Sequence, residues 1–496
     1  MYDQLFADLG ATAPILLVGF LGVAVVLIDS FRNDSVTIPW IAGMGFVVAL
    51  LLEVESMGRE TAHFAGHVLS GGSAGFANAI ILIGALGSLI LSVPYLRRIG
   101  RDYGEVYALV LVATAGMMVL ASAGSLITLF VGLETMSVCL YVLTGLVREE
   151  KGANESALKY FLLGAFSTGF FLYGIALLYG ATGTMMLGEM GAALAATERA
   201  GLFVVGAALL LVGFLFKVSA VPFHMWTPDV YQGAPTTLTA YMSTASKAAA
   251  FGALILVLAR AFPPEVVGES VRVTFAAIAV LTMVVGNVVA VAQRNVKRML
   301  AYSSIAHAGY ILAGLAAGTG AGYSGALFYL LAYTLMNVGA FGVLAALEWD
   351  GEQGADQTLD TLAGAGYRQP FLGVAMGVFM FALTGFPPLA GFIGKYLVFA
   401  AAIDAGLTWV AVVGVLASVV SAYYYLRVLV VLWMRPETDA PAAARVPFRV
   451  APGTAVALGV CVVALLGLGV LPGGVVGAVQ GFFATAAETV AVAAAP

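Results

Sequence analysis

The sequence predicts an all-α integral membrane protein with about fourteen transmembrane helices. Of its 496 residues, 61% are hydrophobic and only 10% are charged, a composition that soluble domains do not have. Apolar runs of about 17–25 residues, the length needed to cross a bilayer, recur along the whole chain. Basic residues concentrate in alternate connecting segments, as they do in multi-pass proteins. These three observations define the fold class.

The predicted spans are separated by segments that hold most of the charged residues. The spans are 12–28, 36–52, 75–93, 106–123, 125–147, 155–179, 201–220, 236–259, 273–292, 298–317, 322–347, 371–403, 407–433 and 453–472. Asp3 and Asp8 precede the first span without any basic side chain, so we expect no cleaved secretory signal. Residues 474–496 are small and apolar, and we expect a short helix on the outer surface.

The basic residues also predict the orientation. With the N-terminus outside, thirteen of them fall in inner segments and four in outer ones, in agreement with the positive-inside rule. The inner set is Arg32, Arg97, Arg98, Arg101, Arg148, Lys151, Arg294, Lys297, Arg298, Arg368, Arg435, Arg445 and Arg449. The outer set is Arg59, Arg199, Arg260 and Arg272. An even number of spans returns the C-terminus to the outside. We therefore expect a protein of the bacterial inner (cytoplasmic) membrane with both termini on the periplasmic side.

Two predicted spans, the seventh and the twelfth, are interrupted by proline, one at Pro222 and the other at Pro387 and its neighbour. Proline removes a backbone donor and clashes with the preceding helical turn. Irregular backbone inside a membrane is tolerated where it is buried in protein or lines water. Each interrupted span also carries a lysine, Lys217 or Lys395. The breaks therefore mark candidate functional positions.

The two breaks lie five spans apart and suggest an internal repeat. The sixth and eleventh spans share a weak echo, Tyr-Phe-Leu-Leu at 160–163 and Phe-Tyr-Leu-Leu at 328–331. Spans four to eight and nine to thirteen are therefore predicted to form two five-helix repeats, and the odd number of spans inverts the second copy. The predicted divisions are 1–100 with three helices, 101–262 and 263–435 with one repeat each, and 436–496 with the last helix and a surface segment.

Four of the six lysines lie inside apolar spans: Lys159, Lys217, Lys247 and Lys395. A charge at the centre of a bilayer costs roughly 2.5–3.5 kcal/mol on insertion scales, so proton movement is the expected use. Glu134 is the acid nearest the centre of a span and a natural partner for one lysine. A charge pair about 4 Å apart is worth ~4 kcal/mol at an effective dielectric of ~20. Moving one charge through 100 mV costs ~2.3 kcal/mol, so separating such a pair can drive a proton uphill.

Structural roles compete with these functional ones. Lys159 lies near the inner end of its span and can snorkel to the surface, and Lys217 can cap carbonyls freed by the break. Glu134 can act as a static counter-ion. His307, near the middle of the tenth span, and His224, within the first break, can be hydrogen-bonded without changing charge.

Other functions find little support in the sequence. The net charge of -5 argues against nucleic-acid binding. Cys139 and Cys461 are too few to hold an iron–sulfur cluster. His63 and His67 stand four residues apart near Glu60, yet a further ligand for a metal is not evident. The chain has no glycine-rich nucleotide-binding motif, so it offers no evident means of binding NADH, flavin or nucleotide.

Four stretches resemble the antiporter-like membrane subunits of respiratory complex I, the proton-pumping NADH–quinone oxidoreductase. The longest, at 217–236, reads K-V-S-A-V-P-F-H-M-W-T-P-D-V-Y-Q-G-A-P-T and contains His224 and Asp229. The others are G-L-E-T-M-S at 132–137, R-M-L-A-Y-S-S-I-A-H-A-G-Y at 298–310, which contains Tyr302 and His307, and L-T-G-F-P-P-L-A-G-F-I-G-K at 383–395.

This resemblance implies two inverted five-helix repeats with discontinuous seventh and twelfth helices. It implies a central hydrophilic axis in which His307 joins two half-channels and whose other members are Glu134, Lys159, Lys217, Lys247 and Lys395. Protons would cross this chain while quinone is reduced elsewhere in the complex. NADH, FMN, iron–sulfur clusters and quinone would all belong to partner subunits, and this chain would hold no redox centre. Its partners would be the other membrane subunits of complex I, including other antiporter-like ones, and membrane lipids.

Three complex I subunits share this fold, and two fit less well. One has a long C-terminal extension, and another usually has glutamate at the position of Lys395, so the chain most resembles the third. Multisubunit sodium/proton antiporters contain a similar chain with buried lysines and form the alternative class. An inert scaffold is a further alternative, and it predicts that apolar replacements of Lys247 or Lys395 are tolerated.

Overall fold

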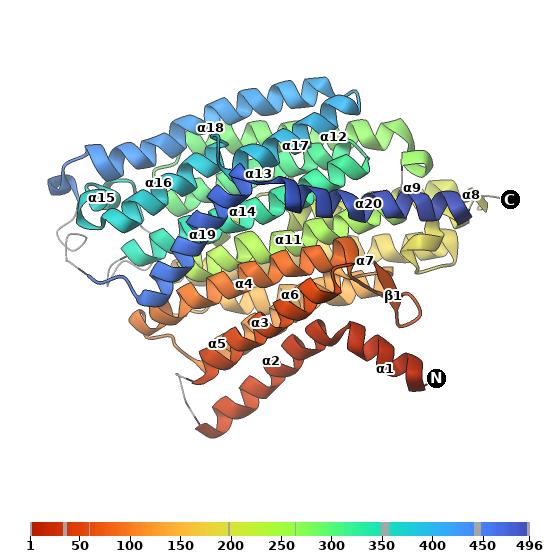
Figure 1. The fold of residues 1–496 in the computed structure, drawn as a ribbon, viewed down its shortest axis with the longest axis horizontal. Helices are drawn as coiled ribbons and strands as arrows, with labels where there is room; N and C mark the ends of the chain where they lie inside the picture. The colour runs from red at the N-terminus through yellow and green to blue at the C-terminus, as the bar shows by residue number, and fades with distance from the viewer. Residues whose placement is uncertain are drawn as a thin grey trace.

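The computed structural model describes residues 2–32, 37–58, 60–196, 199–262, 264–348, 357–440 and 448–493. Almost all of them are helical, and the long helices run side by side in one bundle (Figure 1). Thirteen helices in the described part are long and apolar enough to cross a membrane. A further crossing is divided between two shorter helices, which gives the fourteen crossings that the sequence predicts. The chain is therefore a multi-pass membrane protein.

The N-terminal part contains three crossings and a small hairpin. Its elements are α1 (Tyr2–Ala11), α2 (Ala13–Arg32), α3 (Thr37–Ser56), β1 (Thr61–His63), β2 (Val68–Ser70) and α4 (Gly72–Arg98). The helix α1 was not predicted from the sequence. Its Asp8 carboxylate bonds the His63 ring (3.0 Å) and accepts from the Phe64 backbone N–H (3.2 Å), which fastens α1 to the hairpin.

Two groups of five crossings follow. The first comprises α5 (Gly104–Ala121), α6 (Leu126–Thr144), α7 (Lys151–Thr182), α9 (Ala200–Lys217) with α10 (Thr227–Gly233), and α11 (Thr236–Arg260); α8 (Met190–Ala196) is a short helix between α7 and α9. The second comprises α12 (Pro264–Ala292), α13 (Val296–Ala316), α14 (Gly320–Leu347), α16 (Pro370–Thr384) with α17 (Ala390–Asp404), and α18 (Thr408–Met434); α15 (Ala365–Arg368) precedes α16.

The two groups share a packing pattern in opposite directions. In each group the first helix contacts the second and the last, since α5 packs on α6 and α11 and α12 packs on α13 and α18. The helix α12 is the fifth crossing after α5, so the two helices begin at opposite ends of the bundle. This arrangement agrees with the predicted inverted repeats.

Both predicted breaks are present. Between α9 and α10 the chain leaves helical geometry, and the Val221 N–H, just before Pro222, donates to Thr282 Oγ1 (3.0 Å). The indole of Trp226 donates to the carbonyl of Phe216 near the end of α9 (3.0 Å). Between α16 and α17, next to Pro387, Gly385 adopts a positive φ of 87° that ends α16. Backbone groups freed by the breaks thus find partners inside the protein, as a membrane interior requires.

The C-terminal part consists of α19 (Pro452–Val470) and α20 (Gly473–Ala493). The helix expected within residues 474–496 is present as α20, but it has 21 residues and lies along the bundle (Figure 1). Phe482 contacts Phe76 of α4 (ring centroids 6.2 Å apart) and Phe483 contacts Tyr323 of α14 (5.7 Å). The start of α1 and the end of α20 lie at the same end of the bundle. Arg59 and Arg445, used in the charge count, lie outside the described residues.

The centre of the bundle is formed by α11, α13 and α14. Between 89% and 94% of their most apolar stretches are buried by other helices, whereas the peripheral helices expose one face to the surroundings. Small residues permit this close packing: a side chain at Gly309 of α13 would meet the backbone of α12. Polar side chains on these three helices are therefore shielded from solvent.

Candidate functional site

Lys217 is the last residue of α9, at the edge of the first break, and it is buried. Its Nζ has no hydrogen-bond partner among the described residues, but it lies 5.4 Å from the ring centroids of both Tyr141 and Tyr160. Such positions over aromatic faces favour a cation. Glu134 of α6 acts on Lys217 electrostatically, and its Oε1 also has no hydrogen-bond partner there. The predicted pair therefore shares one neighbourhood without direct hydrogen bonding.

Lys247 lies at the centre of α11 and is 1% exposed. Its Nζ donates to the carbonyl of Ser304 (2.7 Å) and to the hydroxyl of the same residue (2.5 Å). The hydroxyl of Tyr333 on α14 donates to Ser304 Oγ (2.8 Å). Ser304 thus connects Lys247 on α11 to α13 and α14.

His307 of α13 is buried between two tyrosine hydroxyls. Its Nδ1 lies 2.8 Å from Tyr329 Oη and its Nε2 lies 3.0 Å from Tyr425 Oη. Tyr425 Oη is also bonded to the hydroxyl of Ser303, the neighbour of Ser304. Each ring nitrogen therefore has a partner that both donates and accepts, so the imidazole can take a proton on one side and release one on the other.

Lys395 of α17 is buried beside the second break. Its Nζ donates to the carbonyls of Thr384 (2.8 Å) and Leu383 (3.2 Å), the last residues of α16. It lies 4.7 Å from the ring centroid of Tyr310, whose ring meets that of His307 edge to face at 5.5 Å. The charges of Lys247 and Lys395 both act on His307. His307 is thus close enough to both lysines for their charges to act on it, and Tyr310 lies between its ring and Lys395.

Tyrosines surround Lys217, Lys247 and Lys395, and most of their roles were not predicted from the sequence. Tyr160 and Tyr329 belong to the echo between the sixth and eleventh spans; one contacts Lys217 and the other His307. Tyr333 stands four residues after Tyr329, hence on the same face of α14. Such regular spacing of hydroxyl-bearing rings in apolar helices is the signal that could have identified them.

Lys159 occupies a different environment from the other three intramembrane lysines. Its side chain is 42% exposed, and its Nζ bonds the carboxylates of Glu155 (2.6 Å) and Asp229 (2.9 Å). Asp229 of α10 also accepts from Arg298 (2.6 Å), whose guanidinium lies 5.9 Å from the ring centroid of Tyr302. Lys159, Asp229 and Tyr302 therefore belong to a charged rim at the end of the bundle.

For the activity that the resemblance implies, we expect Lys159→Ala to retain quinone reductase turnover within about twofold, because partly exposed ion pairs contribute little and Asp229 keeps Arg298 as a partner. The measurement is NADH-driven turnover of the assembled complex in membrane vesicles. A loss of turnover as large as that caused by Lys217→Ala would instead show that Lys159 acts together with the buried lysines Lys217, Lys247 and Lys395.

The remaining predicted residues occupy the breaks and the hairpin. His224 is partly buried, and its Nδ1 lacks a hydrogen-bond partner among the described residues. His63 and His67 bond different groups, Asp8 and Ser125 (2.8 Å), so they do not converge on one point. Both cysteines are free and buried, as the sequence suggested.

Lys297 corrects one prediction. The charge count placed it in an inner loop, but it is the second residue of α13 and is fully buried. It lies between Arg294 and Arg298 in sequence, which makes the segment resemble a loop. Helical geometry points Lys297 away from Arg298 and into the bundle. Its Nζ donates to the carbonyl of Ala234, between α10 and α11, and the charge of Glu348, directly after α14, acts on it.

A helical bundle with two broken helices and buried lysines beside tyrosine hydroxyls is the architecture of an antiporter-like membrane subunit. Residues 123–421 match the family described as NADH:quinone oxidoreductase/Mrp antiporter, TM. The chain is 58% identical over 501 residues to NADH-quinone oxidoreductase subunit N of Salinibacter ruber, covering 100% of this chain and 99% of that protein. The chain belongs to the NADH:quinone oxidoreductase/Mrp antiporter transmembrane family.

Two solved structures have a similar fold to this chain but differ in their sequence identity to it. A chain of respiratory complex I from Thermus thermophilus is 39% identical and superimposes with a TM-score of 0.80, covering 94% of this chain and 99% of that one. A chain of the Mrp complex from Dietzia sp. reaches a TM-score of 0.84 at 22% identity, with coverages of 96% and 97%. The latter likeness shows the shared fold alone, whereas sequence identity favours the complex I side of the family.

Proposed function

We propose that this chain is the subunit N of a bacterial NADH–quinone oxidoreductase, in which it moves protons across the membrane while quinone is reduced elsewhere in the complex. The single observation that carries this proposal is a buried series of neighbouring groups: Lys247, Ser304, Ser303, Tyr425, His307, Tyr310 and Lys395. Ser304 and Ser303 are adjacent in sequence, and the other neighbours in the series are joined by hydrogen bonds or ring contacts. The identity to subunit N along the whole chain supports the assignment. Lys395, at a position where the M-type subunit usually has glutamate, agrees with it.

The proposed path uses both groups of five helices. Glu134 and Lys217 belong to residues 101–262, with Lys247 at the centre, and His307 and Lys395 belong to residues 263–435. A change in the separation of Glu134 and Lys217 alters the electrostatic energy of a proton on the lysine. The proton is then exchanged with Lys247, and through His307 with Lys395. His224, whose ring nitrogen faces the first break, is proposed to meet water there.

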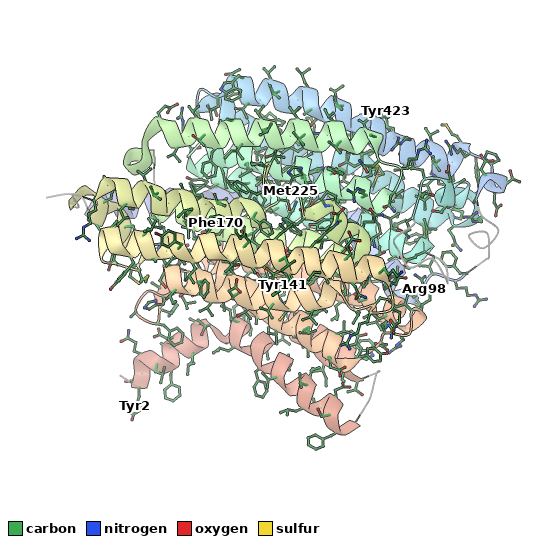
Figure 2. The ribbon with its side chains drawn as sticks, turned by 180° about the vertical axis from the view of Figure 1, so that it is seen from behind. Tyr2, Arg98, Tyr141, Phe170, Met225 and Tyr423 are labelled. Atoms are coloured by element: carbon green, nitrogen blue, oxygen red, sulfur yellow. The ribbon has the colours of Figure 1, made fainter. Side chains whose placement is uncertain are left out.

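Cofactors and orientation follow from the same proposal. NADH, FMN, iron–sulfur clusters and quinone are bound by partner subunits, and this chain contacts neighbouring membrane subunits, other antiporter-like ones among them, and lipid. The described residues include no group of three or more histidine, cysteine or acidic side chains that could hold a metal ion. We place both termini on the periplasmic side of the inner membrane, since Arg98, a member of the predicted inner set, lies at the end of the bundle opposite to Tyr2 (Figure 2).

Replacing Lys217 or Glu134 tests the function. We expect Lys217→Ala and Glu134→Ala each to lower NADH-driven proton pumping and quinone reductase turnover about tenfold, which corresponds to ~1.4 kcal/mol. The control is Lys151→Ala, an exposed lysine at the start of α7. Proton uptake and turnover are measured on purified, fully assembled complex in vesicles. Wild-type rates in both variants would refute the proposal.

The sodium/proton antiporter class is the second candidate that the sequence left open. Its structural neighbour is only 22% identical, so it shares the fold without favouring that activity here. Sodium-dependent proton exchange by the isolated chain in vesicles, with no dependence on NADH oxidation, would favour the antiporter class.

A further inference from the structure

A second set of buried charged groups lies apart from Lys217, Lys247 and Lys395, which we call the lysine row. Glu348, directly after α14, and Lys297 of α13 are 3% and 0% exposed and attract each other electrostatically. The Glu348 carboxylate accepts from the hydroxyls of Tyr95 (2.9 Å) and Thr236 (2.8 Å). Lys297 Nζ donates to the carbonyl of Ala234 (2.6 Å). We call Glu348, Lys297, Tyr95 and Thr236 the Glu348 cluster.

The Glu348 cluster lies just beneath one end of the bundle. Arg98 is exposed, and its guanidinium lies 5.3 Å from the ring centroid of Tyr95 and donates to the carbonyl of Ala345 (2.7 Å). Its charge also acts on Glu348. Figure 2 shows Arg98 at the end of the bundle, whereas Tyr141 lies towards its middle. One layer of side chains therefore separates the cluster from the aqueous phase at that end.

Helical geometry aligns this cluster with the lysine row. On α11, Thr236 precedes Lys247 by eleven residues, and on α13, Lys297 precedes Ser304 by seven. At about 100° per residue, each pair lies within about 20° of the same side of its helix. At ~1.5 Å per residue the offsets are about 10–17 Å along the bundle. Two packed helices thus carry the cluster and the site of Lys247 along one shared side.

The helix α14 also lies along this shared side, and we call the three helices' polar face the α11–α13–α14 seam. Asn337 stands eleven residues before Glu348 and four after Tyr333, so all three lie on one stripe of α14 or its direct continuation. The Asn337 Oδ1 atom is buried and has no hydrogen-bond partner among the described residues, and the same holds for Oε1 of Gln357. The Gln357 backbone carbonyl accepts from the N–H of Val296, next to Lys297. Buried polar atoms of this kind are ordinarily satisfied by ordered water.

Stability is a poor explanation for this pair of charges. Burying two ions costs several kcal/mol each, and their attraction commonly does no more than offset that cost. Glu348 and Lys297 also do not belong to the lysine row, so the proposed proton path does not yet account for them. A buried acid near the aqueous phase, at the head of a polar seam that reaches Lys247, suits proton uptake better.

We propose that Glu348, assisted by Lys297, takes up protons at the Arg98 end of the bundle and passes them along the α11–α13–α14 seam to Lys247. The carboxylate binds a proton from the aqueous phase, and its O–H bond then breaks as water in the seam carries the proton to the neutral amine of Lys247. The amine becomes ammonium, and the carboxylate regains its negative charge opposite the Lys297 ammonium. This inference rests on the proposed function, because it supplies protons to the same row.

A double-variant comparison separates a proton relay from a structural ion pair. Glu348→Gln, Lys297→Met and the double variant are measured for NADH-driven proton uptake in vesicles, using fully assembled complex. We expect all three to be lowered about fivefold or more, roughly 1 kcal/mol in the barrier. If the pair is only structural, the double variant recovers wild-type uptake, because neither buried charge is left without its partner. Recovery in the double variant, or wild-type uptake in Glu348→Gln, overturns the inference.

Asn337→Leu provides a test that leaves the charged pair intact. It removes a polar atom from the seam while preserving side-chain size, and we expect proton uptake to fall about threefold or more. The matched control is Glu53→Gln, because Glu53 is also a buried acid, bonded to Asn78 (3.0 Å) on α4 and outside the seam. If the Glu348 variants fail to assemble, Asn337→Leu decides, and wild-type uptake in it overturns the inference. Normal uptake in Lys247→Met would refute the proposed function itself.

Discussion

Replacing Lys247 by methionine is expected to stop most proton pumping, with a fall of about thirtyfold or more in NADH-driven proton uptake, some 2 kcal/mol. Lys247 donates to both oxygens of Ser304, which belongs to the second group of five helices, so it lies where we propose that protons pass between the two groups. Methionine has similar size and cannot carry a proton. Its nearest polar partners are a carbonyl and hydroxyls, so the change leaves no buried carboxylate unpaired and assembly should be preserved.

A charge-preserving variant sharpens this test. Lys247→Arg keeps a positive charge, but guanidinium does not release its proton in proteins. We expect Lys247→Arg to lose uptake to the same degree as Lys247→Met, while Lys151→Met on the exposed start of α7 behaves as wild type. The scaffold interpretation predicts that methionine is tolerated. Wild-type uptake in the arginine variant would show that only the charge of Lys247 matters.

Substituting Gly391 by alanine is expected to have the largest effect on stability. Gly391 is the second residue of α17, and an added methyl group would overlap the carbonyl oxygen of Ala382 on α16. Because that atom belongs to the backbone, α17 must shift as a whole, and overpacking of this kind costs about 1–3 kcal/mol or more. The shift would also pull Lys395 away from Thr384. We expect the yield of assembled complex to fall severely and its thermal transition to drop.

The control for this substitution is Gly459→Ala. Gly459 lies on α19, and an added methyl group there meets no atom within 4 Å. Alanine favours helix over glycine by roughly 0.5–1 kcal/mol, so this variant should assemble as well as wild type. Yield is measured on native gels and stability by thermal unfolding in detergent. Equal yields for the two variants would contradict the close packing of α16 and α17.

Hydropathy predicted the number and approximate bounds of the crossings because each apolar run must match the bilayer thickness. The breaks were equally accessible, since proline has a local steric effect that needs no tertiary context. The helix α1 was missed because it is short and tied down by a distant partner, His63. Contacts of that kind are not encoded in any sequence window.

The lysine row was predictable as a set but not in its details. Charge in an apolar run identified Lys217, Lys247 and Lys395, whereas Lys159 shares that signal and is partly exposed. The sequence offered capping of freed carbonyls as a structural role for Lys217, but in the structure it is Lys395 that bonds the end of α16. Which carbonyls a lysine reaches depends on how two helix halves are offset, and only the folded chain fixes that offset.

The buried groups around His307 are all of one sign when protonated. Lys247 and Lys395 act on the imidazole with positive charge from two sides, and neither lysine bonds a carboxylate among the described residues. Like charges in a medium of low dielectric repel strongly. A proton that binds one of these three groups thus raises the free energy of a proton on the next group. Protons therefore cannot accumulate along the series, and the arrival of one favours the release of another.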